Sequence, residues 1–315
     1  PHIAVVSINR DKYSETFIQN AFDCLPCKKS LLYGGYLPTH FTTNWRVEGK
    51  EIPVVKPPFW KMKPDSIQAQ RVLNLQNWLK TERVDLILAN YGPSGVALLP
   101  VIQAMQPPMI VHFHGYDAYR DDILGSYGKH YREMFAVAKA IVAVSVDMTR
   151  QLYSLGAPSE KLHTYIYGVD AAVFQRKELP DGPVIFGFVG RFVEKKSPLL
   201  LIQAFARVHA QVPDARLRCV GDGELLAACQ KLAADLGISA AVDFLGALPS
   251  VDVANFLGEC HVVLLPSQRS ASGDSEGTPL VLLEAAMTGR AVVATHHGGI
   301  SDVVFDGKTG LLVPQ

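Results

Sequence analysis

The sequence predicts an α/β protein built from two doubly wound, Rossmann-like domains that face a cleft. Short β-branched runs alternate with longer amphipathic stretches, which is typical of parallel sheets covered by helices on both faces. The 315 residues are 48% hydrophobic and 19% charged, and domains of about 100 to 200 residues make two the natural number. The polar segment RKELPDGP, with Pro180, Gly182 and Pro183, interrupts the series. We therefore predict domains at 1–175 and 183–315.

The first domain contains runs of β-branched and aromatic residues that predict strands. These runs are IAVVSI (3–8), SLLYGG (30–35), VDLILA (84–89), MIVHFH (109–114), AIVAVS (140–145) and HTYIYG (163–168). Helical periodicity fills several of the gaps, notably 65–80 and 94–105. We expect ligands to bind at the carboxyl ends of these strands.

The second domain repeats the alternation after the linker. Its predicted strands are VIFGFVG (184–190), RLRCVG (216–221), AVDFLG (241–246), HVVLLP (261–266) and AVVATH (291–296). Helices are expected near 197–211, 223–236 and 279–288. Two such domains joined by a short hinge form a cleft at their sheet edges.

Composition excludes several classes of function. Lys plus Arg equals Asp plus Glu at 30 each, so the overall charge does not favour nucleic acid as a partner. The mildly basic first half fits either a membrane surface or ordinary scatter of charge. Five scattered cysteines make no disulfide framework, and the pair Cys24 and Cys27 has no companion that would complete a zinc site. With no long apolar window and no signal peptide at the start, we expect a cytoplasmic protein.

The segment SEGTPLVLLE (275–284) carries the strongest local signal. Pro279 stands where a first helical position is expected, and the small residues Gly277 and Thr278 precede it. Such a helix start offers backbone N–H groups and the positive end of a dipole, which suit phosphate. The helix is apolar almost all round, which predicts burial. Its one ionisable group, Glu284, then needs either ribose hydroxyls or a partner inside the fold.

Charged residues in two other loops are candidates for the same site. Glu276 lies eight residues before Glu284, so a nucleotide-sugar with its phosphates at the helix start would bring its ribose near one carboxylate and its sugar near the other. Arg191 and Lys196 follow the first strand of the second domain and could neutralise a diphosphate. A solvated loop carboxylate and a charged surface turn are the alternatives.

Several motifs together resemble a known family. They are G-R-F-x3-K (190–196), C-V-G-D-G (219–223), F-L-G (244–246), E-G-T-P-L-V-L-L-E (276–284) and T-H-H-G-G-I-S-D-V-V (295–304). This combination resembles the retaining family 4 (group 1) glycosyltransferases of GT-B fold. In the first half S-E-T-F-I (14–18), H-F-H-G-Y-D (112–117), A-V-S (143–145) and Y-G-V-D (167–170) are similar to the branch that builds bacterial exopolysaccharides and lipopolysaccharides.

The resemblance implies a role for each matched position. Catalytic roles fall to His114 and Glu276, with Glu276 at the transferred sugar. The donor diphosphate is bound by Arg191, Lys196 and the amides of Gly277, Thr278 and Leu280. Glu284 holds the ribose, and the base lies near Gly246 and Leu248. Ser14, Thr16 and Asp117 lie on the acceptor or sugar side.

The implied activity is metal-independent transfer of a hexose from a nucleoside-diphosphate sugar, with UDP or GDP favoured, to a hydroxyl of a saccharide or lipid-linked acceptor. No cofactor is implied, and peripheral association with the inner face of the membrane fits a lipid-linked acceptor. Retention is expected by front-face attack, in which the leaving phosphate helps to remove the acceptor proton. A catalytically silent sugar-nucleotide-binding protein and a non-hydrolysing sugar-nucleotide 2-epimerase are the alternatives.

The sequence departs from the family at two places. It ends in LLVPQ (311–315), where the resemblance implies further helices, the last returning to the first domain. Asn90 stands in LANYG, where this branch often has a histidine. His296 and His297 are adjacent, so their side chains should point apart rather than share a metal ion, and we assign them to a loop that closes on the donor. We expect His112 to be a packed core residue.

Overall fold

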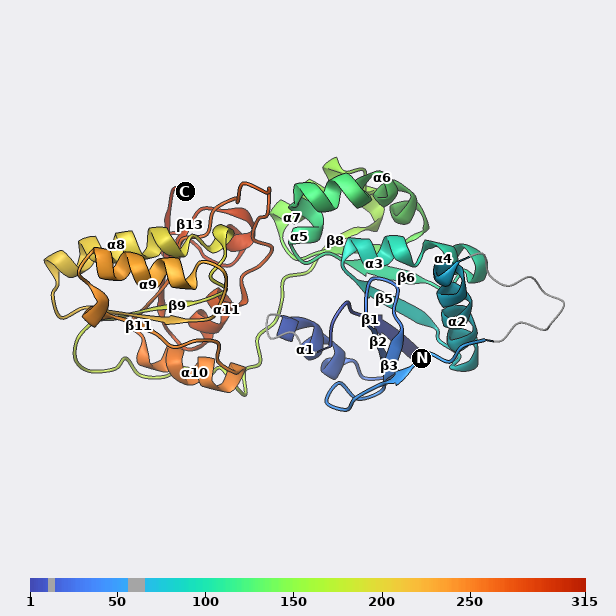
Figure 1. The fold of residues 1–315 in the computed structure, drawn as a ribbon, viewed down its shortest axis with the longest axis horizontal. Coiled ribbons are helices and arrows are strands. Elements are labelled where there is room, and N and C mark those ends of the chain that lie inside the picture. The colour runs from blue at the N-terminus through green and yellow to red at the C-terminus, as the bar shows by residue number, and fades with distance from the viewer. Residues whose placement is uncertain (11–14, 56–65) are drawn as a thin grey trace. The chain divides into compact units, whose positions relative to one another are not determined.

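The computed structural model describes residues 1–10, 15–55 and 66–315, which form two compact units, Pro1–Tyr165 and Ile166–Gln315 (Figure 1). Each unit is a sheet with helices packed on it, so the predicted α/β class with two Rossmann-like domains is confirmed. The predicted cleft between the domains stays a prediction. No helix in the described ranges has the length and apolar content needed to cross a membrane.

The sheet of the first unit has the order β4-β3-β2-β1-β5-β6-β7-β8 among the described residues. Its strands are β1 (His2–Val6), β2 (Lys28–Tyr33), β3 (His40–Thr42), β4 (Lys50–Glu51), β5 (Leu86–Asn90), β6 (Met109–His112), β7 (Ala140–Ala143) and β8 (Leu162–Thr164). All six predicted strands are present and pair in parallel. The short edge strands β3 and β4 are antiparallel and were not predicted.

Helices connect these strands. They are α1 (Thr16–Cys24), α2 (Ile67–Thr81), α3 (Gly92–Ala97), α4 (Leu99–Met105), α5 (Tyr116–Tyr119), α6 (Asp121–Val137) and α7 (Val146–Ser154). The helix predicted at 65–80 is α2 within the described residues. The one predicted at 94–105 is two helices, because α4 starts anew at Leu99 with Pro100 in its first turn, where a proline lacks the N–H that a continuous helix needs.

The second unit is a parallel sheet with the order β11-β10-β9-β12-β13-β14. Its strands are β9 (Ile185–Val189), β10 (Arg216–Val220), β11 (Val242–Phe244), β12 (Val262–Leu265), β13 (Ala291–Thr295) and β14 (Leu311–Val313). The five predicted strands are confirmed, and β14 is an addition at the edge. From β9 to β11 each new strand is added toward one edge of the sheet, and from β12 to β14 each is added toward the opposite edge. The topological switch point therefore lies between β9 and β12.

The helices of the second unit are α8 (Pro198–Gln211), α9 (Leu226–Asp235), α10 (Ser250–Glu259) and α11 (Leu280–Met287). Pro279 is the N-cap of α11 rather than its first residue. The expectation that this helix is buried all round is wrong. It buries Val281, Leu282 and Ala285, but Met287 is 40% exposed. The reason is that α11 packs on one face of the sheet, so its opposite side remains outside the core.

The segment predicted as a linker packs against the second unit. Phe174, two residues before that segment, is 3% exposed and belongs to the core of the second unit. The Lys177 N–H donates to the Thr288 carbonyl at 3.3 Å, and the Arg290 guanidinium donates to the carbonyls of Lys177 and Glu178. The unit boundary consequently lies nearer the N-terminus than the expected 1–175 and 183–315 division, at Tyr165 and Ile166.

Candidate functional site

The candidate site is built on the two loops that leave the switch point of the second sheet. The loop after β9 carries Arg191, Lys195 and Lys196, and the loop after β12 carries Ser267 and Glu276. Since β9 and β12 are parallel neighbours, their carboxyl ends meet at one edge. In open α/β sheets this edge is where ligands bind.

Glycines allow the turns at this edge to lie against one another. Gly221 has φ +133°, and a Cβ there would overlap the Gly190 carbonyl. The Gly190 N–H donates to the Val220 carbonyl at 3.0 Å, and the Phe192 N–H donates to the Asp222 carbonyl at 2.8 Å. This close backbone approach gives the G-R-F and C-V-G-D-G motifs a structural reason, and it sets the direction in which the 191–196 loop leaves the sheet.

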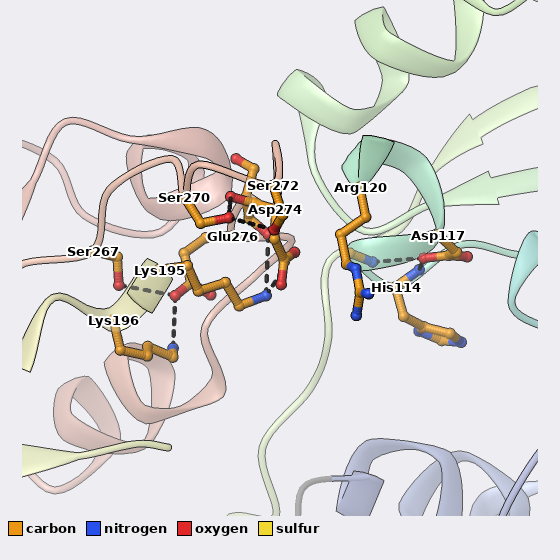
Figure 2. Close-up of polar contacts among 12 residues, drawn as sticks. His114, Asp117, Arg120, Lys195, Lys196, Ser267, Ser270, Ser272, Asp274 and Glu276 are labelled. Atoms are coloured by element: carbon orange, nitrogen blue, oxygen red, sulfur yellow. Dashed lines mark hydrogen bonds and ion pairs between the residues drawn. The ribbon is translucent and has the colours of Figure 1, made fainter. Parts of the chain in front are cut away.

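A buried ion pair joins the two loops. Lys196 Nζ lies 2.8 Å from Glu276 Oε1, and the two side chains are 12% and 6% exposed. Ser267 Oγ donates to the same oxygen at 2.8 Å, as Figure 2 shows. Burial would raise the pKa of Glu276, but the ammonium groups of Lys196 and Lys195 outweigh it and hold that pKa at about 2. Burial lowers the pKa of Lys196, and Glu276 opposes that shift. The carboxylate is therefore ionised at neutral pH.

The backbone of Glu276 is held by the loop that follows β13. Its N–H donates to His297 Nε2 at 3.3 Å, and its carbonyl accepts the Gly299 N–H at 3.3 Å. His297 is 5% exposed while His296 is exposed, so the two imidazoles point apart, as predicted. The T-H-H-G-G motif thus helps to fix the position of Glu276.

The start of α11 presents polar groups that the rest of the described chain leaves unused. The N–H groups of Gly277 and Leu280 donate no hydrogen bond within the described residues, while Thr278 is 7% exposed and does have a partner. One turn further, the half-buried carboxylate of Glu284 has neither a hydrogen bond nor an ion pair to a described residue. Burial raises its pKa to about 7. The internal partner considered as an alternative for Glu284 is not found in the described ranges.

The remaining predicted donor residues lie on the same unit. Arg191 is exposed at the start of its loop and close enough to Lys196 to lower the pKa of that lysine. Gly246 follows β11, has φ +71° and accepts the Gly221 N–H at 2.8 Å. Leu248 packs against the second core. These positions line the loops that leave the carboxyl ends of β9 and β11.

His114 lies in the first unit, just after β6. Its Nε2 is 2.9 Å from Asn90 Oδ1, and Asn90 Nδ2 donates to the Val6 carbonyl at 2.9 Å. Because the amide nitrogen is committed as a donor, Oδ1 must accept, and His114 carries its proton on Nε2. Burial lowers the pKa of His114 well below its usual value, and His112, whose own pKa is about 4, adds to the shift. His114 is therefore a neutral imidazole held in one tautomer by Asn90.

Asp117, expected on the acceptor or sugar side, is enclosed within the first unit. It is 0% exposed, and its carboxylate accepts the N–H groups of Gly92 at 3.0 Å, His114 at 3.0 Å and Gly115 at 2.9 Å. Burial raises its pKa to about 6 against these hydrogen bonds. With both oxygens occupied inside the unit, Asp117 positions the turn that carries His114 (Figure 2).

Of the other residues expected on the acceptor side, Thr16 lies at the start of α1. Thr16 is half-buried and is the first residue of that helix. Ser14 lies outside the described residues. His112, expected in the core, is partly buried, and its ring centroid is 4.2 Å from that of His114.

Three residues of the site were missed from the sequence. Lys195 Nζ lies 3.1 Å from Asp274 Oδ1, and Ser267 binds Glu276. The adjacent lysines and the D-x-E spacing at 274–276 were the available signals. Neither signal predicts an ion pair until β9 and β12 are known to be neighbouring strands.

Both halves of the chain match known glycosyltransferase families. Residues 170–315 match the family described as Glycosyl transferases group 1, and residues 35–173 match that described as Glycosyltransferase Family 4. WcaL of Salmonella typhimurium, a glycosyltransferase named for colanic acid biosynthesis, is 32% identical over 235 residues, which are 73% of this chain and 58% of WcaL. The amylovoran biosynthesis glycosyltransferase AmsK of Erwinia amylovora is 30% identical over 236 residues, again 73% and 58%. The chain thus spans less than two thirds of these relatives.

Solved structures show the same fold at low sequence identity. HepE of Anabaena, in complex with UDP and glucose, superposes with a TM-score of 0.74 at 17% identity, covering 99% of this chain and 85% of that one. Sucrose-phosphate synthase of Thermosynechococcus elongatus gives 0.75 at 18% identity, covering 99% and 86%. With a family match on each half and the two-unit α/β architecture, the chain belongs to the group 1 (family 4) glycosyltransferases and has their GT-B fold.

Proposed function

We propose that the chain transfers a hexose from a nucleoside-diphosphate sugar to a hydroxyl of a saccharide or lipid-linked acceptor. One observation carries this proposal. At the switch point of the second sheet, the segment 275–284 and its neighbouring loop bring together the buried Lys196–Glu276 ion pair, the start of α11 and Glu284. The N–H groups of Gly277 and Leu280 and the carboxylate of Glu284 have no hydrogen-bond partner among the described residues. Cations, a helix start and a carboxylate are the groups that bind diphosphate and ribose.

The donor is bound in two parts. Its diphosphate binds the N–H groups at the start of α11 together with Arg191 and Lys196, and its ribose hydroxyls donate to Glu284. Lys196 already pairs with Glu276 at 2.8 Å, so a bound diphosphate shares this lysine with the carboxylate. These cations do the work that a divalent metal ion does in other transferases, and the proposed reaction is accordingly metal-independent with no cofactor.

The chemistry follows from where charge develops. Breaking the anomeric C–O bond leaves negative charge on the diphosphate and oxocarbenium character on the sugar. Arg191, Lys196 and the helix start stabilise the leaving group. Glu276, with a pKa of about 2, stays ionised and so acts by its charge and by accepting hydrogen bonds from the sugar, not as an acid. The acceptor hydroxyl attacks the anomeric carbon from the leaving-group face and passes its proton to the departing phosphate. Because attack and departure occur on the same face, the anomeric configuration is retained.

Relatives suggest which donor and acceptor to test. HepE was solved with UDP and glucose and with UDP-glucose, and a mannosyltransferase of Mycolicibacterium smegmatis, 32% identical over 188 residues, is named as GDP-mannose-dependent. UDP and GDP sugars are therefore the proposed donors. WcaL and AmsK are named for polysaccharide biosynthesis, which favours a bacterial exopolysaccharide intermediate made at the cytoplasmic face of the membrane as the acceptor.

A thermal-shift panel tests the donor half of this proposal. UDP, GDP, ADP and dTDP and their common sugars are added to the chain, and the binding donor raises the unfolding temperature. The donor that binds is then assayed for hydrolysis and for transfer. No shift with any donor would refute a nucleotide-sugar site. Binding without hydrolysis or transfer would instead identify a catalytically silent binding protein.

A further inference from the structure

Two adjacent lysines of one turn pair with two carboxylates of one loop. The turn is the 3-10 segment Glu194–Lys196, which follows β9. Lys196 pairs with Glu276 at 2.8 Å, and Lys195 pairs with Asp274 at 3.1 Å. The side chains of Lys195 and Asp274 are 10% and 16% exposed. Figure 2 shows the two pairs side by side. The second pair makes no contact with the donor in the arrangement proposed above.

The contacts of Lys195 are directed into the 268–276 loop. Its Nζ also donates to the Ser275 carbonyl at 3.3 Å, one residue before Glu276, and the residue is 8% exposed. Its carbonyl accepts the Gln268 N–H at 2.9 Å. Glu194 Oε1 accepts the Ala271 N–H at 2.9 Å. The turn therefore holds the loop at its beginning, its middle and its end.

This arrangement matters because Lys196 has two tasks under the proposed function. In the chain without donor it pairs with Glu276, and in the donor complex it also binds diphosphate. Its attraction for Glu276 is then divided. Ser267 and the backbone contacts of the loop remain to hold the carboxylate, and Lys195 maintains those loop contacts without touching the donor.

We propose that the Lys195–Asp274 ion pair is a positioning pair that keeps Glu276 in its working geometry while the donor diphosphate engages Lys196. The inference rests on the proposed function. It assigns the two lysines different tasks: Lys196 contacts the leaving group, and Lys195 orders the loop that carries the sugar-binding carboxylate. A small displacement of such a group reduces turnover more than binding.

The test compares Lys195→Met, Asp274→Asn and the double variant with the wild-type chain. Hydrolysis of UDP-glucose and of GDP-mannose is measured, together with the Kd of UDP and GDP. We expect kcat to fall about 10- to 100-fold while KM and nucleotide Kd stay within about twofold of wild type. Because both residues act through one pair, the double variant should be no slower than the worse single variant. Lys195→Arg, which keeps the charge, should recover part of the lost kcat.

Matched controls are available in the same unit. Lys231 and Asp235 form an exposed pair at 2.6 Å on α9, so Lys231→Met and Asp235→Asn remove the same groups where no positioning role exists, and kcat should not change. A single variant leaves a buried charge unpaired and could fail to fold, whereas the double variant leaves none. Wild-type kcat in the folded double variant, or parallel losses of kcat and nucleotide affinity, would overturn the positioning role. A wild-type chain that neither binds nor hydrolyses either donor would overturn the proposed function instead.

Discussion

Glu284 combines partial burial with the lack of a described side-chain partner, and this combination makes its protonation sensitive to a ligand. Burial raises its pKa to about 7. Ribose hydroxyls donate hydrogen bonds, which favour the ionised carboxylate. Nucleotide binding should therefore be strongest above pH 7 and should weaken as the carboxyl group takes up a proton below that value.

The first prediction concerns the pH dependence of donor affinity. Between pH 8 and pH 6 the Kd for the binding donor, UDP-glucose or GDP-mannose, should rise, by at most about tenfold per pH unit for one titrating group. A nucleotide-sugar is used because its diphosphate does not titrate in this range. Glu284→Gln should bind more weakly at pH 8 and lose this dependence. Isothermal calorimetry at three pH values measures both effects, and a Gln variant with the wild-type profile would contradict the role of Glu284.

The same substitution should stabilise the chain without nucleotide. A carboxyl group whose pKa is raised by folding binds more protons in the folded state, so its contribution to the unfolding free energy decreases as pH rises from its usual pKa to about 7. Glu284→Gln has no titrating group at this position, so its unfolding free energy does not decrease in this way as pH rises. We expect a higher unfolding temperature than wild type at pH 8 and little difference at pH 5, measured by scanning fluorimetry. A lower unfolding temperature at pH 8 would show that Glu284 has a stabilising partner.

Glu276 should show the opposite pattern of effects. Glu276→Gln removes the charge that faces the sugar but keeps the size of the side chain, so kcat should fall by about 100-fold or more. The nucleotide Kd should not rise, because Lys196 and the start of α11 remain to bind the diphosphate. Single-turnover hydrolysis with parallel nucleotide titration separates the two quantities. Unchanged kcat would remove Glu276 from the catalytic site.

Residue types in local motifs located much of this site before its geometry was known. Glu276 and Glu284 were selected for their eight-residue spacing around a predicted helix start, and Lys196 for its place after the first strand of the second domain, in combination with that segment. The acceptor-side role of Asp117 stays a prediction, and the sequence did not show that three backbone N–H groups enclose its carboxylate. The Lys196–Glu276 pair was not foreseen either, since it depends on which strands are neighbours.

Among the elements of the second unit, the loop after β13 has a steric role in the site. Gly298 has φ +49°, and a Cβ there would lie 2.5 Å from the Glu276 carbonyl oxygen. Only a residue without a side chain lets this loop approach the backbone of Glu276. The loop is thus a support whose position is coupled to that of the carboxylate.

Gly298→Ala is therefore expected to displace Glu276 and lower kcat by about tenfold or more. Gly307→Ala is its matched control, since Gly307 has φ +68° but nothing within 4 Å of the added Cβ. Both variants carry the cost of an unfavourable backbone conformation, and only the first has the clash. Donor hydrolysis and unfolding temperature are measured for both. Equal kcat in the two variants would show that the contact has no bearing on turnover.

Strand prediction found the central strands and the edge strands β8 and β11, but it missed the short strands β3, β4 and β14. The β-branched runs of β9, β12 and β13 are continuous because helices cover both sides of the sheet. β4 consists of Lys50 and Glu51, both exposed, and β14 is a short strand with two of its three residues exposed. Edge strands of this kind are fixed by pairing with a neighbour, which local composition does not encode.

At the scale of the whole molecule, the segment before β9 belongs to the second unit through its buried residues. Phe174→Ala should destabilise that unit by about 3 to 5 kcal/mol, because it removes a large side chain that is 3% exposed. Leu179→Ala, in the same segment but at a residue 61% exposed, should change little. Urea unfolding with and without the binding nucleotide measures both variants. A small effect of Phe174→Ala would favour a free linker.

The order of strands in the second sheet also determines when a growing chain acquires its ligand site. Lys195 and Asp274 are separated by 79 positions, and their loops meet only after β12 has paired with β9. Most of this unit must therefore be synthesised before the proposed donor site can form. Under the proposed function, nucleotide therefore stabilises the finished sheet but not its precursors. Added donor should slow unfolding without speeding the first folding of the chain.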